Sequence, residues 1–141
     1  MPNWCYNDLI VKKNDADNYI LDSEKRVDFS ILVPEPNSKD ECDIKYIITD
    51  NEIPPIEIDD DKPWFNWYHW HINEWGTKWN ARRTCVSNKA NDEYIISFET
   101  PWGPPVGWLK ALAEKGIKFH LDWKEETGYK DVITNETILE E

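Results

Sequence analysis

The sequence predicts a single α+β domain, and two kinds of pattern lead to this class. Some short segments alternate apolar and polar residues as strands do, while others repeat apolar residues at helical spacing. The chain has 141 residues, of which 40% are hydrophobic and 13% aromatic, and this is enough material for one core. We therefore expect residues 1–141 to form one domain in which strands and helices share that core.

The first third of the chain is expected to supply two strands and one short helix. Residues 4–12 begin with alternation and end in an apolar trio, which predicts a strand that is buried at its end. Asn14 or Asp15 can cap a short helix that includes Tyr19. Residues 27–33 alternate cleanly and stop at a Pro-Glu-Pro sequence, so they predict a second strand.

An acidic segment with several prolines follows at residues 37–62, and we expect it to be an insertion outside the core. Residues 43–49 could form a weak strand inside it. Between positions 40 and 61 there are nine acids against one lysine, a charge of −8 out of the net −12. These acids are Asp40, Glu41, Asp43, Asp50, Glu52, Glu57, Asp59, Asp60 and Asp61.

Residues 63–75 are unusually rich in Trp and are predicted to form a helix that anchors the core. Pro63 suits a first helical turn, and Gly76 can end the helix with a positive φ. Phe65 and Trp70 lie off the main aromatic face and are expected on the outer surface. That main face is formed by Trp64, Trp67, Tyr68, His71 and Trp75.

The C-terminal half is expected to contain strands around one helix. After a loop at Arg82 and Arg83, residues 93–100 predict a strand, and a proline-rich turn leads into a helix over residues 106–115. Two further strands are expected, at residues 117–123 and 129–133. The acidic tail from Glu136 is expected to fray.

The order of the expected elements is that of a ferredoxin-like split βαβ sandwich: strand, helix, strand, Trp-rich helical insertion, strand, helix and strand. The term names a shape and implies no iron–sulfur cluster. The fold class that we expect is therefore a ferredoxin-like α+β sandwich with a Trp-rich helical insertion.

Four motifs occur along the chain in a distinctive order. They are MPNWC with Asn7, WGTKWN at residues 75–80, FETPW at residues 98–102 with Pro104 and Pro105, and Trp123-x-Glu125-x-x-Gly128. Together they resemble a family found on phages and plasmids and known as YubB-type, whose phage members carry a ferredoxin-like domain. The resemblance implies this fold, a home on mobile elements and action in the bacterial cytoplasm. It implies no reaction and no catalytic residue.

Composition excludes several classes of function. The net charge of −12 argues against general binding to nucleic-acid phosphates, so we expect no direct DNA binding. No apolar run approaches the ~20 residues that cross a membrane. The three cysteines form no CxxC pair, which favours reduced thiols in a cytoplasm over a zinc site. The sequence also lacks a nucleophile elbow, a phosphate-binding Gly loop and HExxH, so we expect no catalytic residue, no metal and no cofactor.

The WGTKWN turn is the strongest candidate site. An indole there could stack on a planar ring, cations could pair with phosphate, and an amide could read a base edge. The same side chains could equally pack on the sheet and fix the turn. Eight residues make up the candidate ligand site: Trp75, Lys78, Trp79, Asn80, Arg82, Arg83, Trp102 and Asn7.

We expect a non-enzymatic accessory protein, with counter-defence as its setting, that binds a host protein or a small nucleotide-like ligand at this turn. In the alternative, the acidic segment imitates a nucleic-acid backbone and occupies a host nucleic-acid-binding protein. The residues for that role are Asp40, Glu41, Asp43, Asp59, Asp60 and Asp61. An enzyme acting on a nucleotide is the third hypothesis.

Overall fold

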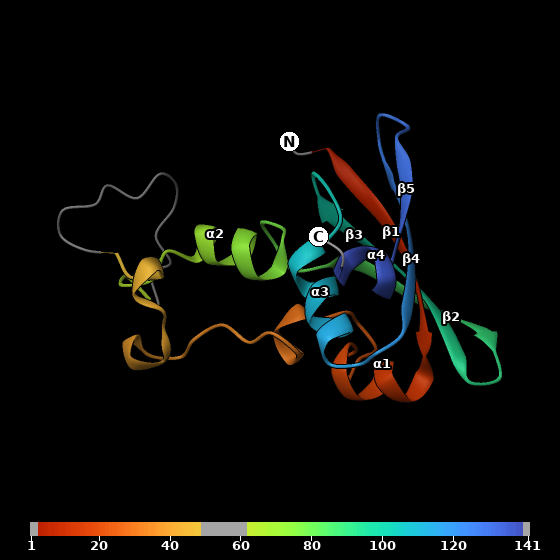
Figure 1. The fold of residues 1–141 in the computed structure, drawn as a ribbon, viewed down its shortest axis with the longest axis horizontal. Helices are drawn as coiled ribbons and strands as arrows, with labels where there is room; N and C mark the ends of the chain where they lie inside the picture. Colours follow the sequence, from red (N-terminus) through yellow and green to blue (C-terminus); the bar gives the residue numbers. More distant parts are fainter. Residues whose placement is uncertain (1–2, 49–61, 140–141) are drawn as a thin grey trace.

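The computed structural model describes residues 3–48 and 62–139, and its centre is one five-stranded antiparallel sheet (Figure 1). The strand order is β2-β3-β1-β4-β5. The strands are β1 (Trp4–Lys12), β2 (Arg82–Ala90), β3 (Glu93–Pro101), β4 (Phe119–Glu125) and β5 (Lys130–Thr134).

Helices α1 (Lys13–Tyr19) and α3 (Val106–Glu114) connect the strands in the order β1-α1-β2-β3-α3-β4. With β1 lying between β3 and β4, this is the arrangement of a split βαβ sandwich. Strand β5 and helix α4 (Asn135–Leu139) extend it at one edge. The α+β prediction is confirmed.

One face of the sheet is buried and the other is open. Along β1, Leu9 and Val11 are buried while Asp8 is exposed, because successive side chains of a strand point to opposite faces. Helix α3 covers the buried face with Trp108 and Leu109, both fully enclosed. Each such side chain contributes about 1.5–3 kcal/mol of burial free energy. Within residues 3–48 and 62–139, no helix covers the opposite sheet face, as Figure 1 shows.

The predicted strand at residues 27–33 is wrong. Val27 forms only an isolated bridge with Leu21, and a 3₁₀ turn follows at Phe29–Ile31. The Asp28 carboxylate accepts hydrogen bonds from both the N–H and the hydroxyl of Ser30 (3.0 and 2.6 Å), which folds the chain into a turn. The apolar alternation here arises because Val27 and Phe29 reach the core from a turn.

The predicted loop at Arg82 and Arg83 is also wrong, because both residues begin β2. Arg83 has a positive φ of 53°, and the register of β2 against β3 shifts between Arg82 and Cys85. This bulge starts an edge strand whose exposed polar residues carry no strong strand signal. The Trp-rich helix consequently lies between α1 and β2.

The Trp-rich helix begins at Trp67 instead of Pro63 and changes its winding along its length. Helix α2 (Trp67–Trp70) continues into a π turn at His71–Trp75, closed by Gly76 N–H donating to His71 O (3.0 Å). A π turn brings residues five apart onto one side. Trp70 and Trp75 are therefore both buried, with ring centroids 5.4 Å apart.

The expectation that Phe65 and Trp70 lie on the outer surface is thus wrong. Phe65 is fully buried and packs on Trp70, with centroids 6.0 Å apart. Trp64 and Trp67, expected at the centre of the buried face, are only half-buried. The π turn and the later helix start together rotate the apolar face away from the α-helical stripe.

Two glycines let the Trp-rich helix contact α3 directly. A Cβ on Gly76 (φ 81°) would lie 2.6 Å from the backbone nitrogen of Gly107, and a Cβ on Gly107 would lie 2.5 Å from the Glu74 carbonyl oxygen. Neither position has room for a side chain. The backbone of the WGTKWN turn is therefore held against the start of α3.

The acidic segment and the C-terminal tail also differ from the expectations. Ile44–Tyr46 forms a 3₁₀ turn followed by a single bridge between Ile47 and Phe65, so the weak strand is wrong over its described part, residues 43–48. The tail does not fray at Glu136, because α4 runs to Leu139 and its Ile138 is buried.

Candidate functional site

The WGTKWN turn carries an exposed row of rings and cations. Lys78 Nζ lies 4.5 Å from the centre of the Trp79 ring. The Trp79 side chain is 39% exposed and lies beside Trp4 of β1, with centroids 6.2 Å apart. The guanidinium carbon of Arg82 lies 3.3 Å from the centre of the Trp4 ring. We call Lys78, Trp79, Trp4 and Arg82 the Trp4–Trp79 cluster, in which cation–π and ring contacts alternate.

The cations around this cluster differ in how far a carboxylate already neutralises them. Arg82 donates Nε–H to Glu99 Oε1 (3.0 Å) and holds a second nitrogen 2.9 Å from the same oxygen. Arg83 is 71% exposed and lies 3.9 Å from the other Glu99 oxygen. Lys78 makes no ion pair with any residue that the structure describes. Positive charge for a ligand therefore comes from Lys78 and Arg83, while Arg82 orients the indole of Trp4.

Trp102 lies at the same end of the sheet as Trp4. Its N–H donates to Asn3 O (2.7 Å), which extends the β1–β3 pairing by one step. Its side chain is 58% exposed and its φ of 70° is unusual for Trp. The backbone thus presents a second exposed indole beside the N-terminal end of β1.

Three other residues of the predicted site point into the fold. Trp75 is 3% exposed and donates its indole N–H to Val33 O (2.9 Å). Asn80 Oδ1 accepts from Phe29 N–H (2.9 Å), so this amide holds the 3₁₀ turn in place. Asn7 is buried on β1 and donates to Thr100 Oγ1 (3.0 Å). Their polar groups have partners within the domain, so these three residues support the surface from beneath.

A half-buried polar network ties the WGTKWN turn to the residues after the 3₁₀ turn. His71 Nδ1 faces Lys78 O (2.6 Å), and its Nε2 is hydrogen-bonded to Glu35 Oε1. Lys62 Nζ lies 3.6 Å from the other Glu35 oxygen and donates to Pro36 O (2.8 Å). The hydrogen bond from His71 lowers the pKa of Glu35, and the charges of His71 and Lys62 lower it further. Burial of the carboxylate raises the same pKa, but by less than these contacts lower it.

The acids of the alternative hypothesis are only partly described. Asp40 is exposed, Glu41 accepts a hydrogen bond from Asn37 N–H (3.0 Å), and Asp43 accepts one from Lys45 N–H (3.3 Å). Asp59, Asp60 and Asp61 lie outside the described residues. The nucleic-acid-mimic hypothesis stays a prediction.

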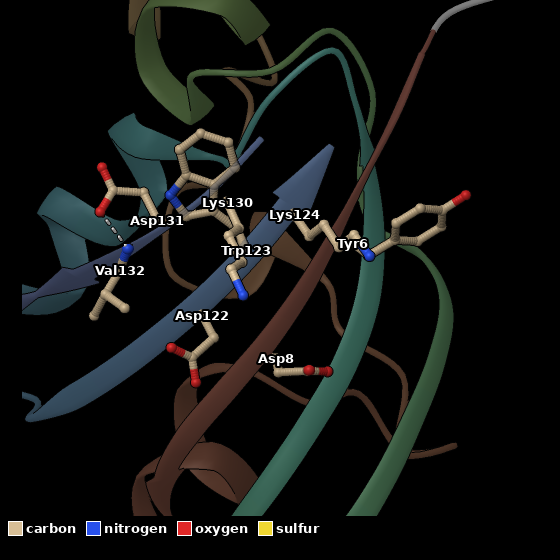
Figure 2. A pocket seen from close by; sticks show the side chains of 8 residues that line it. All are labelled: Tyr6, Asp8, Asp122, Trp123, Lys124, Lys130, Asp131 and Val132. Carbon is tan, nitrogen blue, oxygen red and sulfur yellow. Dashed lines mark hydrogen bonds between the residues drawn. The ribbon is translucent and has the colours of Figure 1, made fainter. Parts of the chain in front are cut away.

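The open sheet face also has a pocket of about 560 Å³ over β1, β4 and β5 (Figure 2). Asp8 and Asp122 face each other in register, while Lys124 and Lys130 pair across β4 and β5. Asp8 accepts from the Ser97 hydroxyl (2.6 Å). With carboxylates and ammonium groups interspersed, this pocket has no single sign of charge that would select an anion or a cation.

Sequence reasoning missed two residues that shape the cluster. Glu99 positions Arg82 from the neighbouring strand, and Tyr68 lies 6.0 Å from Lys78 Nζ. Glu99 stands in the FETPW motif, but the alternation of β3 gives no sign that it faces Arg82. That contact depends on the register of β2, which the sequence pattern did not reveal.

Comparison with known proteins supports the ferredoxin-like fold and says little about function. Residues 74–139 match the model of a family described as a ferredoxin-like domain in Api92-like protein. This region runs from the end of the Trp-rich helix through β2 to α4. It supports a ferredoxin-like domain, and it includes the WGTKWN turn.

Two proteins from Arabidopsis thaliana, the CBS domain-containing proteins CBSCBSPB5 and CBSCBSPB4, are each 27% identical over 59 residues. The matched segment is 42% of this chain but only 11% of each relative, so the chain spans about a tenth of the length of these relatives. No solved structure matches this chain. Within the described residues, no helix has the length and apolar character to cross a membrane.

Proposed function

We propose that this protein binds, without catalysis, a host component or a small nucleotide-like anionic ligand at the Trp4–Trp79 cluster. The observation that carries the proposal is the half-exposed Trp79 ring beside Lys78, a cation without a carboxylate partner among the described residues. An indole offers a face to a planar group, and the ammonium offers a charge to an anion. These are the two contacts that a nucleotide-like ligand needs.

The cluster is built to hold its geometry before a ligand arrives. Trp4 is fixed on a central strand between Trp79 and Arg82, and Arg82 is itself fixed by Glu99. Below it, the close contact of Gly76 with Gly107 holds the turn against α3. A preorganised surface loses less conformational freedom on binding, so more of the contact energy appears as affinity.

The biological setting is part of the same proposal. The motif resemblance to YubB-type proteins supports a mobile-element protein that acts in a bacterial cytoplasm, with counter-defence as the role. Sequestration of a host component would need only a binding surface, which agrees with a site made of rings and cations. No activity is carried over from the Arabidopsis proteins.

Native mass spectrometry of the protein purified from bacterial lysate tests the proposal. We expect a bound mass that is lost on denaturation and strongly reduced in Trp79→Ala and Lys78→Ala. Stacking contributes about 1–3 kcal/mol per ring, so Trp79→Ala should weaken binding by about fivefold or more. A ligand held equally by both variants would contradict the proposed site.

Lys115→Ala is the matched control, because Lys115 Nζ also lies over an aromatic ring, that of Tyr19, at 4.6 Å. This pair lies away from the cluster, on α1 and the end of α3. The control variant should retain the ligand in full. Loss of the ligand in all three variants would indicate a general charge effect.

A further inference from the structure

The two edges of the sheet differ in how their outward backbone groups are satisfied. Glu125 N–H donates to Tyr129 O (2.8 Å), which sets the alternation of the antiparallel pairing between β4 and β5. As a result, Val132 and Thr134 turn their N–H groups away from β4. Asp131 Oδ1 accepts the N–H of Val132 (2.8 Å), as Figure 2 shows, and Thr137 Oγ1 accepts that of Thr134 (2.8 Å). Side chains therefore close the β5 edge at Val132 and Thr134.

The β2 edge has no such closure over part of its length. Trp102 N–H bonds to Asn3 O, so even-numbered residues of β3 bond to β1 and odd-numbered residues bond to β2. Cys85 and Ser87, which lie opposite Ser97 and Ile95, thus bond to β3. Their neighbours Val86 and Asn88 point N–H and C=O outward.

The beginning of this edge is occupied by the chain itself. Val27 N–H donates to the Thr84 hydroxyl (3.0 Å), and the Phe29 N–H reaches Asn80. Beyond Thr84, no residue in the described ranges bonds to the outward groups of Val86 or Asn88. A short open edge therefore lies between the bulge at Arg83 and the shift after Asn88.

The charge around this edge is opposite to that of the protein. Residues 75–91 contain four cations, Lys78, Arg82, Arg83 and Lys89, and no acid, whereas the whole chain carries −12. Glu99 already pairs with Arg82, so Arg83, whose side chain is 71% exposed, and the exposed Lys89 are the cations that β2 offers to an anionic partner. The outward N–H and C=O groups require a partner with the same groups at the same spacing, which an extended polypeptide has and a nucleic acid lacks.

We propose that the β2 edge at Val86 and Asn88 binds an acidic, extended peptide segment of a partner protein, which adds to the sheet as a sixth strand. The inference goes beyond the proposed function, because it names a second binding surface and the class of partner that this surface takes. Main-chain hydrogen bonds would supply the affinity, and Lys89 and Arg83 would select carboxylates. Trp79 lies before the start of β2, so a longer peptide could continue towards it.

The first test uses two pools of seven-residue peptides that alternate a fixed residue with a random one, the fixed residue being Glu in one pool and Lys in the other. With ¹⁵N-labelled protein, the Glu pool should shift the amide signals of Val86 and Asn88. The Lys pool should bind about tenfold more weakly or worse. No shift from the Glu pool at about 1 mM, or equal shifts from both pools, would overturn the proposal.

N-methylated peptides test the strand geometry without altering the protein. Alternate residues of an added strand face the edge, so methylation of one alternate set should abolish binding and methylation of the other should preserve it. Equal binding by the two sets would rule out strand addition.

Variants of Val86 give the protein-side test. Val86→Pro removes an outward N–H, which an edge strand tolerates, and should weaken Glu-pool binding by about tenfold. Val86→Ala loses at least as much core packing but keeps the N–H, and should bind as the unchanged protein does. Equal binding by the two variants would contradict the proposal.

Other occupants of the β2 edge, and the proposed function at the Trp4–Trp79 cluster, each predict a different outcome. Shifts at Val86 caused by oligothymidylate, or a concentration-dependent dimer that protects the Val86 amide, would replace the peptide with a nucleic acid or a second copy. A lysate ligand lost in Trp79→Ala but retained in Val86→Pro would sustain the proposed function and refute the peptide dock. The reverse pattern would sustain the dock and refute the Trp4–Trp79 site.

Discussion

The imidazole of His71 stacks on the indole of Trp75, with ring centroids 4.1 Å apart and planes inclined by 18°. The edge of the same imidazole joins Glu35 to the carbonyl of Lys78. One residue of the Trp-rich helix therefore connects the core, the segment after the 3₁₀ turn and the backbone of the candidate site. A substitution that breaks this connection should lower the free energy of unfolding, whether or not a ligand is bound.

Acid should weaken this connection through Glu35. Its folded-state pKa lies below the ordinary value of 4.5, chiefly because of the His71 hydrogen bond, so the ionised form is favoured by folding. The resulting stability is fully present above pH 4.5 and is lost as pH falls through the lowered folded-state pKa. Urea unfolding from pH 6 to pH 3 should show Glu35→Gln less stable at pH 6 and the difference shrinking towards pH 3. A constant difference would argue against this linkage.

Gly76→Ala should destabilise the fold strongly, because a Cβ there meets the Gly107 nitrogen at 2.6 Å and φ is 81°. Strain and overpacking together predict a loss of about 3 kcal/mol or more in the free energy of unfolding. Gly103→Ala is the control, since its Cβ would meet no atom within 4 Å. Thermal unfolding of both variants should separate them, and similar melting temperatures would disprove the tight contact.

Asn80→Ala should cost about 1–3 kcal/mol, because it leaves the Phe29 N–H without its acceptor and removes a donor to Asp28. Asn80→Asp keeps the acceptor but places a second carboxylate beside Asp28, so we expect it to be destabilised at neutral pH as well. The exposed Asn18→Ala, which loses only a 3.3 Å bond to Asn14, should change stability by less than about 0.5 kcal/mol. Urea midpoints measure all three variants. A neutral Asn80→Ala would mean that Asn80 does not hold the 3₁₀ turn.

Two of the three thiols, Cys85 and Cys5, should react with iodoacetamide in a fixed order. Burial raises the pKa of Cys5 to about 12, whereas Cys85 is exposed on β2. Because the thiolate is the reacting form, Cys85 should be alkylated first at pH 8 and Cys5 only after unfolding. Peptide mass mapping over time gives the order, and Cys85→Ser should remove the fastest phase. Early labelling of Cys5 would show that the start of β1 opens.

The elements that the sequence predicted well are those with one buried face. β1, β3, α3 and β4 each repeat apolar residues at the period of their structure because the core selects them. β2 has no such pattern, since an edge strand with polar side chains is held by the backbone bonds of its neighbour. Residues 27–33 show the opposite error, because a turn that sends Val27 and Phe29 inward copies the alternation of a strand.

The contacts of the candidate site could be predicted most directly where its residues are neighbours in the sequence. Lys78 and Trp79 stand in one motif, so their proximity is evident from the sequence. Glu99 meets Arg82 through the register of β2 against β3, which residue spacing does not encode. Asn80 had a polar group suited to a ligand, but the same group suits a turn, and the long-range bond to Phe29 decides between them.

The π turn at His71–Trp75 holds one residue more than an α-helical turn would, because its closing bond runs from Gly76 back to His71. Removal of the solvent-facing Ile72 would let the remaining residues wind as an ordinary α turn. Four residues at about 100° each complete nearly the same rotation as the five residues of the π turn, so the chain beyond would keep nearly the same direction. Related chains that lack one residue at this place should therefore still hold the WGTKWN turn against α3.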